Sequence, residues 1–242
     1  MKTVIVVPAR LQSERFPRKL LHPIKGKPLI QWTAERIKSQ VSEFDLYFAV
    51  GEKELSDYLQ GLGYQTLLTD PSLPSGTDRI AVANESIGAD RIINVQADEP
   101  LVAREHILSL AKSLEDGADL STLATEFDSD EDFKDPNKVK VVLNNDSQAL
   151  YFSRAAIPYN RTQKGVLSKG NSFWHLGLYA YTKEFLESFQ KWSPTPLEQL
   201  EKLEQLRALE MGAKIGVSIT DKRTIGIDTL EDVEVFEQFL DI

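Results

Sequence analysis

The sequence of 242 residues contains no cysteine, which excludes disulfide bonds, thiolate metal sites and cysteine nucleophiles. It has three histidines (His22, His106 and His175) and no His-x-x-x-His spacing, so we expect no zinc site. No apolar run approaches the length that spans a bilayer, and the apolar start of the chain reaches Pro8 and Arg10 too early for a signal sequence. We therefore expect a cytoplasmic protein that does not bind a membrane.

Positive charge is also in short supply. The chain has 28 basic against 37 acidic residues and a formal net charge of -9, which argues against nucleic acid as a partner. A single small anion is not excluded, because it responds to local charge. The hydrophobic content of 41% and charged content of 27% are typical of a soluble protein that forms one large domain, or a domain with an excursion.

Strand and helix patterns alternate through the first hundred residues. We predict strands at residues 4–7, 46–50, 64–68 and 92–95. The helix predicted to start near Pro28 places Leu29, Thr33 and Ile37 on one face at a spacing of four. This alternation predicts an α/β fold with a doubly wound, mostly parallel, Rossmann-like sheet.

The predicted strand at 92–95 is followed by Gln96, Asp98 and Glu99. In open α/β sheets the ligand lies just beyond the carboxyl ends of the strands, where two carboxylates could hold a divalent cation beside phosphates. The alternative is that Asp98 or Glu99 caps the helix that starts near Ala103. These residues alone do not separate the two interpretations.

Four cations lie close together directly after the first predicted strand. They are Arg10, Arg15, Arg18 and Lys19, and two prolines restrain the loop that carries them. Doubly wound folds bind phosphates at this position, and a restrained loop loses less entropy when it binds a flexible triphosphate. The alternative is a solvated basic loop, but its position in an acidic protein favours anion binding.

The tripeptide Ser75-Gly76-Thr77 supplies hydroxyl groups and a permissive backbone at a predicted helix start. Such a site suits the close approach of a base or ribose. Thr77 could also act only as the helix cap.

The second half of the chain is richer in short strands. We expect residues 137–185 to form an excursion for dimerisation or sugar binding. One face of 137–143 is expected to face solvent or a partner, because polar and apolar residues alternate there. The Tyr-rich segment 175–181 is expected to lie on a symmetric dimer surface. The acidic run at 128–132 is typical of a solvated turn, and residues 196–211 are typical of one charged amphipathic helix.

With these segments in place, the chain resembles the bacterial CMP-Kdo synthetases, the cytidylyltransferases that activate 3-deoxy-manno-octulosonate (Kdo). The resemblance covers nearly the whole length. The motifs that carry it lie at residues 8–10, 15–19, 75–79, 94–100, 137–142, 151–154, 175–179, 196–198, 203–207 and 227–229. It implies one cytidylyltransferase domain over residues 1–242, with a nucleotide-diphospho-sugar transferase-like fold.

The resemblance implies transfer of CMP from CTP to the anomeric 2-hydroxyl of Kdo or its 8-amino analogue, with release of pyrophosphate, for lipopolysaccharide biosynthesis. It also implies a homodimer. The alternatives are another sugar nucleotidyltransferase, such as a CMP-sialate synthetase or an enzyme that uses UTP, or a catalytically silent binding protein. Retention of Lys19, Asp98 and Asp228 argues against the silent protein, which would need none of them.

The resemblance also assigns residues to roles. The catalytic residues would be Lys19, Arg15 and Asp98, and Mg²⁺ would be held by Asp98 and Asp228. The nucleotide would be bound by Pro8, Ala9, Arg10, Arg15, Lys19, Ser75, Gly76, Thr77, Arg79 and Gln96. The sugar acid would be bound by Gln96, Arg154, His175, Tyr179, Glu204 and Gln205. Without the resemblance, Glu204 and Gln205 are typical of an ordinary helix surface.

The chain departs from the family pattern near the predicted substrates. Arg18 and Ala97 stand where the family has glycine, and Leu20 stands where it has proline. Arginine cannot adopt all the backbone conformations of glycine. We interpret these changes as retuning of the substrate pocket, which leaves room for a related sugar such as the 8-amino form.

Overall fold

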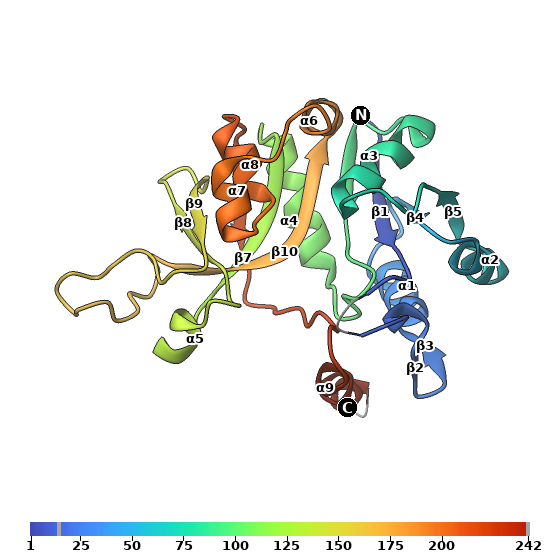
Figure 1. Ribbon diagram of the computed structural model, residues 1–242, viewed down its shortest axis with the longest axis horizontal. Coiled ribbons are helices and arrows are strands. Elements are labelled where there is room, and N and C mark those ends of the chain that lie inside the picture. Colours follow the sequence, from blue (N-terminus) through green and yellow to red (C-terminus); the bar gives the residue numbers. More distant parts are fainter. Residues whose placement is uncertain (14–15, 241–242) are drawn as a thin grey trace. The chain divides into compact units, whose positions relative to one another are not determined.

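The computed structural model describes residues 1–13 and 16–240 (Figure 1). The chain forms two compact units: unit 1 comprises Met1–Ile107 and Thr224–Ile242, and unit 2 comprises Leu108–Arg223. The chain therefore leaves unit 1 within α4 (Arg104–Glu115) and returns to it before its last helix. The expected single domain, with its excursion at residues 137–185, stays a prediction.

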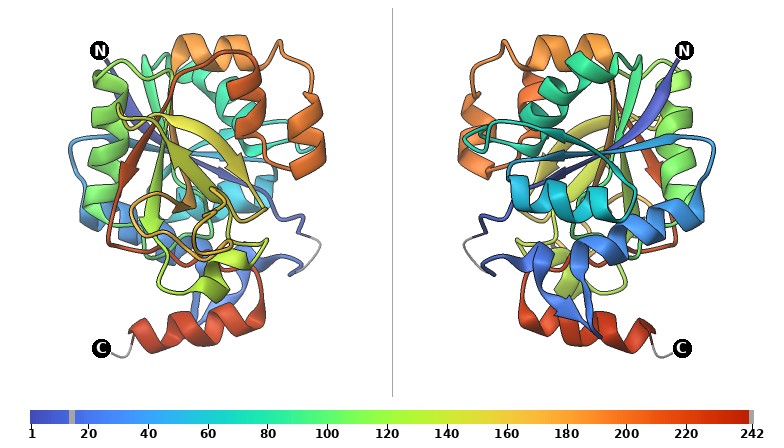
Figure 2. Two further views of the ribbon diagram at one scale, coloured as in Figure 1. Left: turned by 90° about the vertical axis from the view of Figure 1, so that its left-hand side faces the viewer. Right: turned by 90° about the vertical axis from the view of Figure 1, so that its right-hand side faces the viewer.

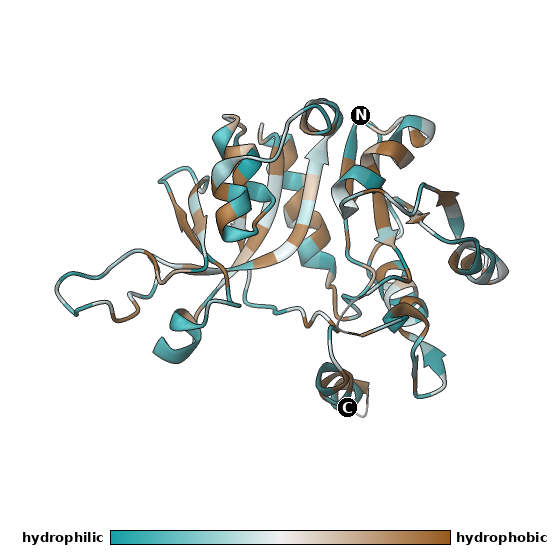
Figure 3. Cartoon of the chain, viewed as in Figure 1, coloured by the Kyte–Doolittle hydropathy of each residue, from teal (hydrophilic) through white to brown (hydrophobic). Residues whose placement is uncertain are grey.

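Unit 1 contains a parallel sheet in the order β6-β1-β4-β5. β1 (Thr3–Ala9) pairs with both β4 (Asp45–Val50) and β6 (Arg91–Asn94), and β5 (Gln65–Leu68) pairs with β4. All three pairings are parallel, as the alternating pattern predicted. β1 is central because it has a strand on each edge, and its side chains from Val4 to Val7 are fully buried. Figure 3 shows its hydrophobic colouring.

Helices of unit 1 connect these strands. They are α1 (Leu29–Gln40), α2 (Lys53–Gly61) and α3 (Gly76–Ile87), and the right-hand view of Figure 2 shows α1 and α2 in front of the strands. Leu29, Thr33 and Ile37 are buried on the inner face of α1, as predicted. Among the described residues, no helix combines the length and the apolar character needed to cross a membrane.

Short elements after the first loop escaped prediction. They are a 3₁₀ helix, η1 (Lys19–Leu21), and a hairpin of β2 (Pro23–Ile24) and β3 (Lys27–Pro28). The last helix, α9 (Leu230–Leu240), packs on α1 through an edge-to-face contact between Phe236 and Trp32, whose ring centroids are 6.0 Å apart. The C-terminal segment is thereby fixed beside the elements that follow β1.

Unit 2 is built on a mixed sheet. β7 (Leu120–Glu126) pairs in parallel with β11 (Ile215–Ile219) and antiparallel with β10 (Phe173–Thr182). β8 (Lys140–Leu143) continues the sheet from β10, and β9 (Ala149–Ser153) pairs with β8, both antiparallel. The helices of this unit are α5 (Asp130–Lys134), α6 (Lys183–Phe189), α7 (Pro196–Glu201), α8 (Gln205–Glu210) and the larger part of α4.

A bulge interrupts the pairing of β10 with β7 between Leu176 and Tyr179. The hydroxyl of Thr122 on β7 lies in this irregularity, 2.8 Å from the carbonyl oxygen of Leu178 and 2.9 Å from Nε2 of His175. A bulge changes the direction of the side chains around it. Here it places polar groups of β10 around one buried threonine.

Two local predictions in unit 2 were wrong. The acidic run contains a helix, α5, because Ser129 caps it by accepting a hydrogen bond from the amide of Asp132 at 3.1 Å. The polar face expected to be exposed at 137–143 includes Lys140, which is fully buried. Its ammonium group donates to the carbonyl oxygens of Asp135 and Arg154 at 2.7 and 2.9 Å, and these bonds offset its burial.

The predicted single helix at 196–211 is also two helices, α7 and α8. Lys202 between them adopts a left-handed conformation with φ of 55°, which ends α7. The change of direction buries Leu203 and Leu206, whereas Leu200 is 80% exposed.

The sequence interpretation located the dimer surface on residues 175–181. These residues lie within β10, where His175, Leu176, Leu178, Ala180 and Tyr181 are all buried within the chain. These buried side chains are therefore not available to a partner in this structure, and the dimer surface stays a prediction.

A partly enclosed ion pair joins α7 to α8. Arg207 donates through Nε to Glu198 at 2.8 Å and through Nη2 at 2.5 Å, and the two side chains are 12% and 13% exposed. Burial raises the pKa of Glu198, but the bonds from Arg207 outweigh it, so the pKa lies below its ordinary value of 4.5. The ionised form is therefore favoured by folding.

We expect Glu198→Gln to reduce the free energy of unfolding at neutral pH by about 1.5–3 kcal/mol, because a charge-assisted bidentate pair is lost. A lowered folded-state pKa contributes stability above the unfolded value of 4.5 and loses it as the pH falls through the folded value. The difference between the variant and the native protein should therefore shrink on acidification. Urea unfolding at about pH 7 and about pH 3.5 measures it.

The matched control is Glu187→Gln, because Glu187 lies in an exposed pair 3.6 Å from Lys183. This change should cost less than about 0.5 kcal/mol. A loss for Glu198→Gln that is the same at both pH values would contradict the assignment.

Candidate active site

A polar cleft of about 840 Å³ lies in unit 1 where the strand order reverses. β1 and β6 are neighbours there, and the chain after each strand leaves in a different direction, which is where doubly wound sheets bind ligands. The residues that line the cleft are Pro8, Ala9, Arg10, Gln12, Ser13, Lys19, Leu20, Ser75, Gly76, Arg79, Gln96, Ala97, Asp98 and Asp228.

Hydrogen bonds close the basic loop that follows β1. The amide of Arg18 donates to the carbonyl of Leu11 at 3.2 Å, and the amide of Leu11 donates to the carboxylate of Glu52 at 3.0 Å. Arg10 is exposed and lines the cleft. The loop thus presents a cation at the cleft while its backbone is tied to the start of α2.

Arg18 occupies a left-handed conformation with φ of 57°. Glycine adopts this conformation without cost, whereas arginine is strained in it. The side chain points away to pair with Glu54 at 2.6 Å. The replacement of glycine at this position therefore adds an ion pair to α2, and Arg18 does not line the cleft.

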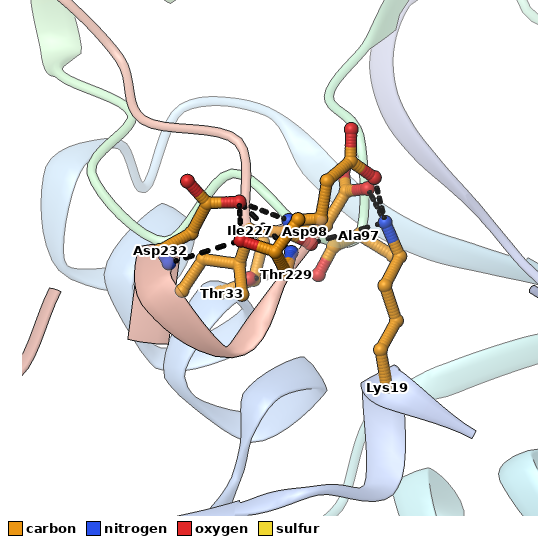
Figure 4. Close-up of polar contacts among 8 residues, drawn as sticks. Lys19, Thr33, Ala97, Asp98, Ile227, Thr229 and Asp232 are labelled. Atoms are coloured by element: carbon orange, nitrogen blue, oxygen red, sulfur yellow. Dashed lines mark hydrogen bonds and ion pairs between the residues drawn. The ribbon is translucent and has the colours of Figure 1, made fainter. Parts of the chain in front are cut away.

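At the floor of the cleft, Lys19 joins two carboxylates (Figure 4). Its Nζ bonds to Asp98, to Oδ1 of Asp228 at 2.8 Å and to the carbonyl oxygen of Ile227 at 3.1 Å. The Lys19 side chain is 13% exposed. Burial lowers its pKa, but Asp98 and Asp228 outweigh burial and raise it, so Lys19 is a cation.

The backbone around this group is fixed from several sides (Figure 4). The hydroxyl of Thr33 on α1 donates to the carbonyl of Ala97 at 2.9 Å, and the amide of Ile227 donates to the carbonyl of Asp98 at 3.0 Å. These bonds attach the segment after β6 to α1 and to the C-terminal segment. They set the position of Asp98 through its main chain.

Asp228 is positioned by the start of α9. Asp232 accepts hydrogen bonds from the amide of Asp228 at 2.9 Å and from the amide of Thr229 at 2.8 Å. The hydroxyl of Thr229 in turn accepts from the amide of Asp232 at 3.3 Å. This reciprocal arrangement is a capping box, and it holds the backbone that presents Asp228 to Lys19.

Glu99 lies next to Asp98 but is buried. Burial, together with the neighbouring charges of Asp98 and Asp228, raises its pKa to about 8. Within the described part of the chain, its Oε2 has no hydrogen-bond partner. The expected pair of carboxylates therefore consists of Asp98 and Asp228, whereas Glu99 carries a proton at neutral pH.

Arg79 forms part of the wall of the cleft from α3. Its guanidinium is buried and donates to the hydroxyl of Thr69 and to the carbonyl of Asp70. Burial lowers its pKa. Ser75 caps α3 by accepting from the amide of Asp78 at 3.1 Å, so Thr77 is not the cap, and Thr77 is buried.

Unit 2 contains a second group of the predicted residues. His175 is buried, which lowers its pKa to about 3 and keeps it neutral. The hydroxyl of Tyr179 donates to Oε1 of Gln205 at 3.3 Å, while burial, Tyr181 and Glu204 raise its pKa. Nε2 of Gln205 is buried and, in the part of the chain that the structure describes, has no hydrogen-bond partner. This amide therefore carries an unused hydrogen-bond donor.

Arg154 is held by main-chain oxygens. Nε donates to the carbonyl of Glu201 at 2.7 Å, and Nη1 donates to the carbonyl of Pro136 at 3.0 Å. The carboxylate of Glu201 accepts from the amide of Arg154 and from the hydroxyl of Ser153. The guanidinium is thus oriented by neutral groups, and its positive charge is not cancelled by these contacts.

The structure brings most of the predicted nucleotide residues to one cleft. Pro8, Ala9, Arg10, Lys19, Ser75, Gly76, Arg79 and Gln96 line it together with Asp98 and Asp228. Thr77 does not line it, and Arg15 lies outside the described residues. Of the predicted sugar residues, Gln96 belongs to unit 1 and Arg154, His175, Tyr179, Glu204 and Gln205 belong to unit 2.

Other residues of the site escaped the sequence interpretation. Gln12 and Ser13 line the cleft, and Thr33 and Asp232 fix the backbone around the two aspartates. The spacing of Thr229 and Asp232 is the signal of a capping box and could have identified Asp232. Nothing in the sequence marks Thr33, because a threonine on the inner face of a helix is typical of a core residue.

Comparison with known proteins agrees with this geometry. A family described as Cytidylyltransferase matches residues 4–215. A 3-deoxy-manno-octulosonate cytidylyltransferase of Chloroherpeton thalassium is 44% identical over 96% of this chain and 95% of its own length. An 8-amino-3,8-dideoxy-manno-octulosonate cytidylyltransferase of Shewanella halifaxensis is 40% identical over 98% of each chain.

Solved structures give the same grouping. A CMP:2-keto-3-deoxy-manno-octonic acid synthetase complexed with CTP superposes with a TM-score of 0.92 at 33% identity, over 100% of this chain and 99% of that one. A thymidylyltransferase of Bacillus anthracis, 12% identical over 98% of this chain and 94% of its own, shares the fold with a TM-score of 0.66. The chain therefore belongs to the cytidylyltransferase family, in the group of the 3-deoxy-manno-octulosonate cytidylyltransferases.

Proposed function

We propose that this enzyme transfers CMP from CTP to the 2-hydroxyl of a 3-deoxy-manno-octulosonate sugar acid and releases pyrophosphate. The observation that carries the proposal is the cleft of unit 1, in which the floor formed by Lys19, Asp98 and Asp228 lies at the reversal of the strand order. The names of the relatives support CTP and an octulosonate as substrates. They favour these over a sialate or a uridine nucleotide, and they support a role in lipopolysaccharide biosynthesis.

The nucleotide would bind with its phosphates toward the cations of the cleft. Arg10 is exposed there and can pair with phosphate oxygens, and Lys19 can do so once its ammonium group turns from the carboxylates. Gly76 lies close to the Pro8 ring, since a Cβ on Gly76 would lie 3.4 Å from Cγ of Pro8. This narrow side of the cleft suits the flat base, with the Ser75 hydroxyl nearby.

The two aspartates fit a magnesium ion. They already share one cation in this structure, the ammonium group of Lys19, although they are far apart in the chain. Among the described residues, no three or more acidic or histidine side chains gather as a metal cage, and Mg²⁺ is commonly held by one or two carboxylates together with substrate phosphates. When bound, Mg²⁺ supplies neutralisation of charge on the phosphoryl oxygens.

In the reaction, the sugar 2-hydroxyl attacks the α-phosphorus of CTP and the bond to the β-phosphate oxygen breaks. The proton of the hydroxyl passes to solvent, and pyrophosphate leaves with the electron pair of the broken bond. Such a transfer depends on positioning and on stabilisation of negative charge more than on covalent catalysis. Lys19 and Arg10 would stabilise the leaving pyrophosphate. The resemblance implies a role of the same kind for Arg15.

The sugar acid would be held by the polar group of unit 2. Arg154 can bind its carboxylate, because its guanidinium is oriented by neutral carbonyls and retains its charge. Neutral His175, Tyr179 and the free amide of Gln205 can bind hydroxyls. A pyrophosphate-release assay with each nucleoside triphosphate and a panel of sugar acids tests the whole proposal, which fails if CTP with an octulosonate gives no turnover.

The first substitution concerns the metal. Asp98→Asn should fold normally but lower kcat by at least about a hundredfold, because it removes a charged ligand beside the reacting phosphate. Asp57→Asn is the matched control, since Asp57 is exposed and pairs only with Lys53 among the contacts that the structure describes. Pyrophosphate release in excess Mg²⁺ measures both variants. Full activity of Asp98→Asn would contradict the metal assignment.

The second substitution concerns the sugar. Glu204→Gln should lower kcat/KM about tenfold for Kdo and for its 8-amino analogue alike, because Glu204 lies by Tyr179 among the proposed hydroxyl-binding groups. Glu187→Gln, on the exposed part of α6, is the control. A loss confined to the 8-amino sugar would instead show that Glu204 pairs with its ammonium group. If neither sugar is affected, Glu204 does not contact the substrate.

A third prediction concerns assembly. We propose a homodimer, supported by exposed apolar side chains of unit 2 such as Leu150 on β9 and Leu200 on α7, which are 61% and 80% exposed. Light scattering at micromolar concentration should give twice the mass of 27.3 kDa. A monomeric mass would remove the dimer from the proposal.

A further inference from the structure

Lys19 occupies the position that the two aspartates would otherwise offer to a metal ion. Its Nζ contacts three oxygens, one each from Asp98, Asp228 and the carbonyl of Ile227. Oxygen atoms of this kind are the ligands that hard divalent cations prefer. The ammonium group and a divalent cation therefore require the same atoms.

The carboxylates and the lysine differ in how firmly they are held. Hydrogen bonds from Ile227 and Asp232 fix the backbone at Asp98 and Asp228. Lys19 reaches them from η1 through a flexible four-carbon side chain. The ammonium group can leave while the oxygens stay in place, and the cleft beside it is large enough to receive a triphosphate.

We propose that Lys19 is the resident counter-ion of Asp98 and Asp228 in the nucleotide-free protein and competes with divalent metal for them. The triphosphate offers the ammonium group a second set of anionic oxygens. When the ammonium group moves to these oxygens, it releases the two carboxylates to the metal. Nucleotide and metal therefore bind with positive coupling that depends on Lys19. This inference rests on the proposed function for the identity of the triphosphate.

In the nucleotide-free protein, replacement of Lys19 should change the metal affinity in the opposite direction to replacement of a residue that binds the metal. Removal of Lys19 should strengthen metal binding, because its ammonium group no longer occupies the carboxylate oxygens that the metal requires. The same change should weaken the binding of CTP, because a phosphate contact is lost. A lysine with a merely structural role would weaken both or neither.

The test uses Mn²⁺ alone as the probe, with nucleotide-free protein and electron paramagnetic resonance to count the free ion. We expect Lys19→Met and Lys19→Gln to bind Mn²⁺ at least roughly tenfold more tightly than the native protein, since a unit charge beside the ion is removed. Lys53→Met is the matched control, because Lys53 pairs with Asp57 on the exposed face of α2, and its affinity should stay at the native value.

The double variant Lys19→Met/Asp98→Asn tests whether the increased Mn²⁺ affinity depends on Asp98. It should lose the increase that Lys19→Met shows. Thermal unfolding provides a second readout, because Mn²⁺ should raise the Tm of Lys19→Met more than that of the native protein. The proposal is overturned if folded Lys19→Met and Lys19→Gln bind Mn²⁺ no more tightly than the native protein, or if the gain persists in the double variant. Pyrophosphate release by the native enzyme is measured separately, so failure of the proposed function is distinguished from failure of this coupling.

Discussion

The parallel pairing of β6 with β1 is the constraint on which the site depends. Because both strands run in the same direction, their carboxyl ends meet at one edge of the sheet. The chain continues from β1 into the basic loop and from β6 into the segment with Asp98. A cationic loop and an acidic segment more than seventy residues apart are thus brought together by main-chain hydrogen bonds, without any need for the ions to attract each other first.

Electrostatics then decides what these neighbours do. Two ionised carboxylates close together repel each other, and in this structure one lysine offsets the repulsion. Glu99, in the same place but without contact with that cation, is kept neutral by burial instead. The site therefore has two acidic groups suited to a cation and one that avoids charge, although all three have the same side-chain chemistry.

Much of the fold could be predicted from the sequence, because strands such as β1 and β4 are continuous apolar runs and helices such as α1 have a regular inner face. The hairpin of β2 and β3 could not, since two residues in each strand are too few for any period to appear. The break between α7 and α8 was also hidden, because Lys202 adopts a conformation that usually belongs to glycine.

The site was predictable in its members but not in its contacts. The resemblance identified Lys19, Asp98 and Asp228, yet no local pattern reveals that one lysine bonds to both aspartates, because Asp228 is separated from it by 209 positions. The exposure of individual side chains was equally hard to predict from the sequence. Lys140 looked like a surface residue because its strand alternates, and only tertiary contacts with two carbonyls explain its burial.

The return of the chain to unit 1 has a consequence for synthesis on the ribosome. Residues 1–107 and their parallel sheet can form early, but Ile227, Asp228 and the helix that positions them emerge only after the whole of unit 2 has been made. Until then Lys19 faces a single aspartate and Asp98 lacks the hydrogen bond from Ile227. A nascent chain can therefore expose a folded cleft whose floor is still unfinished, so the proposed site is completed as one of the last events in the formation of the molecule.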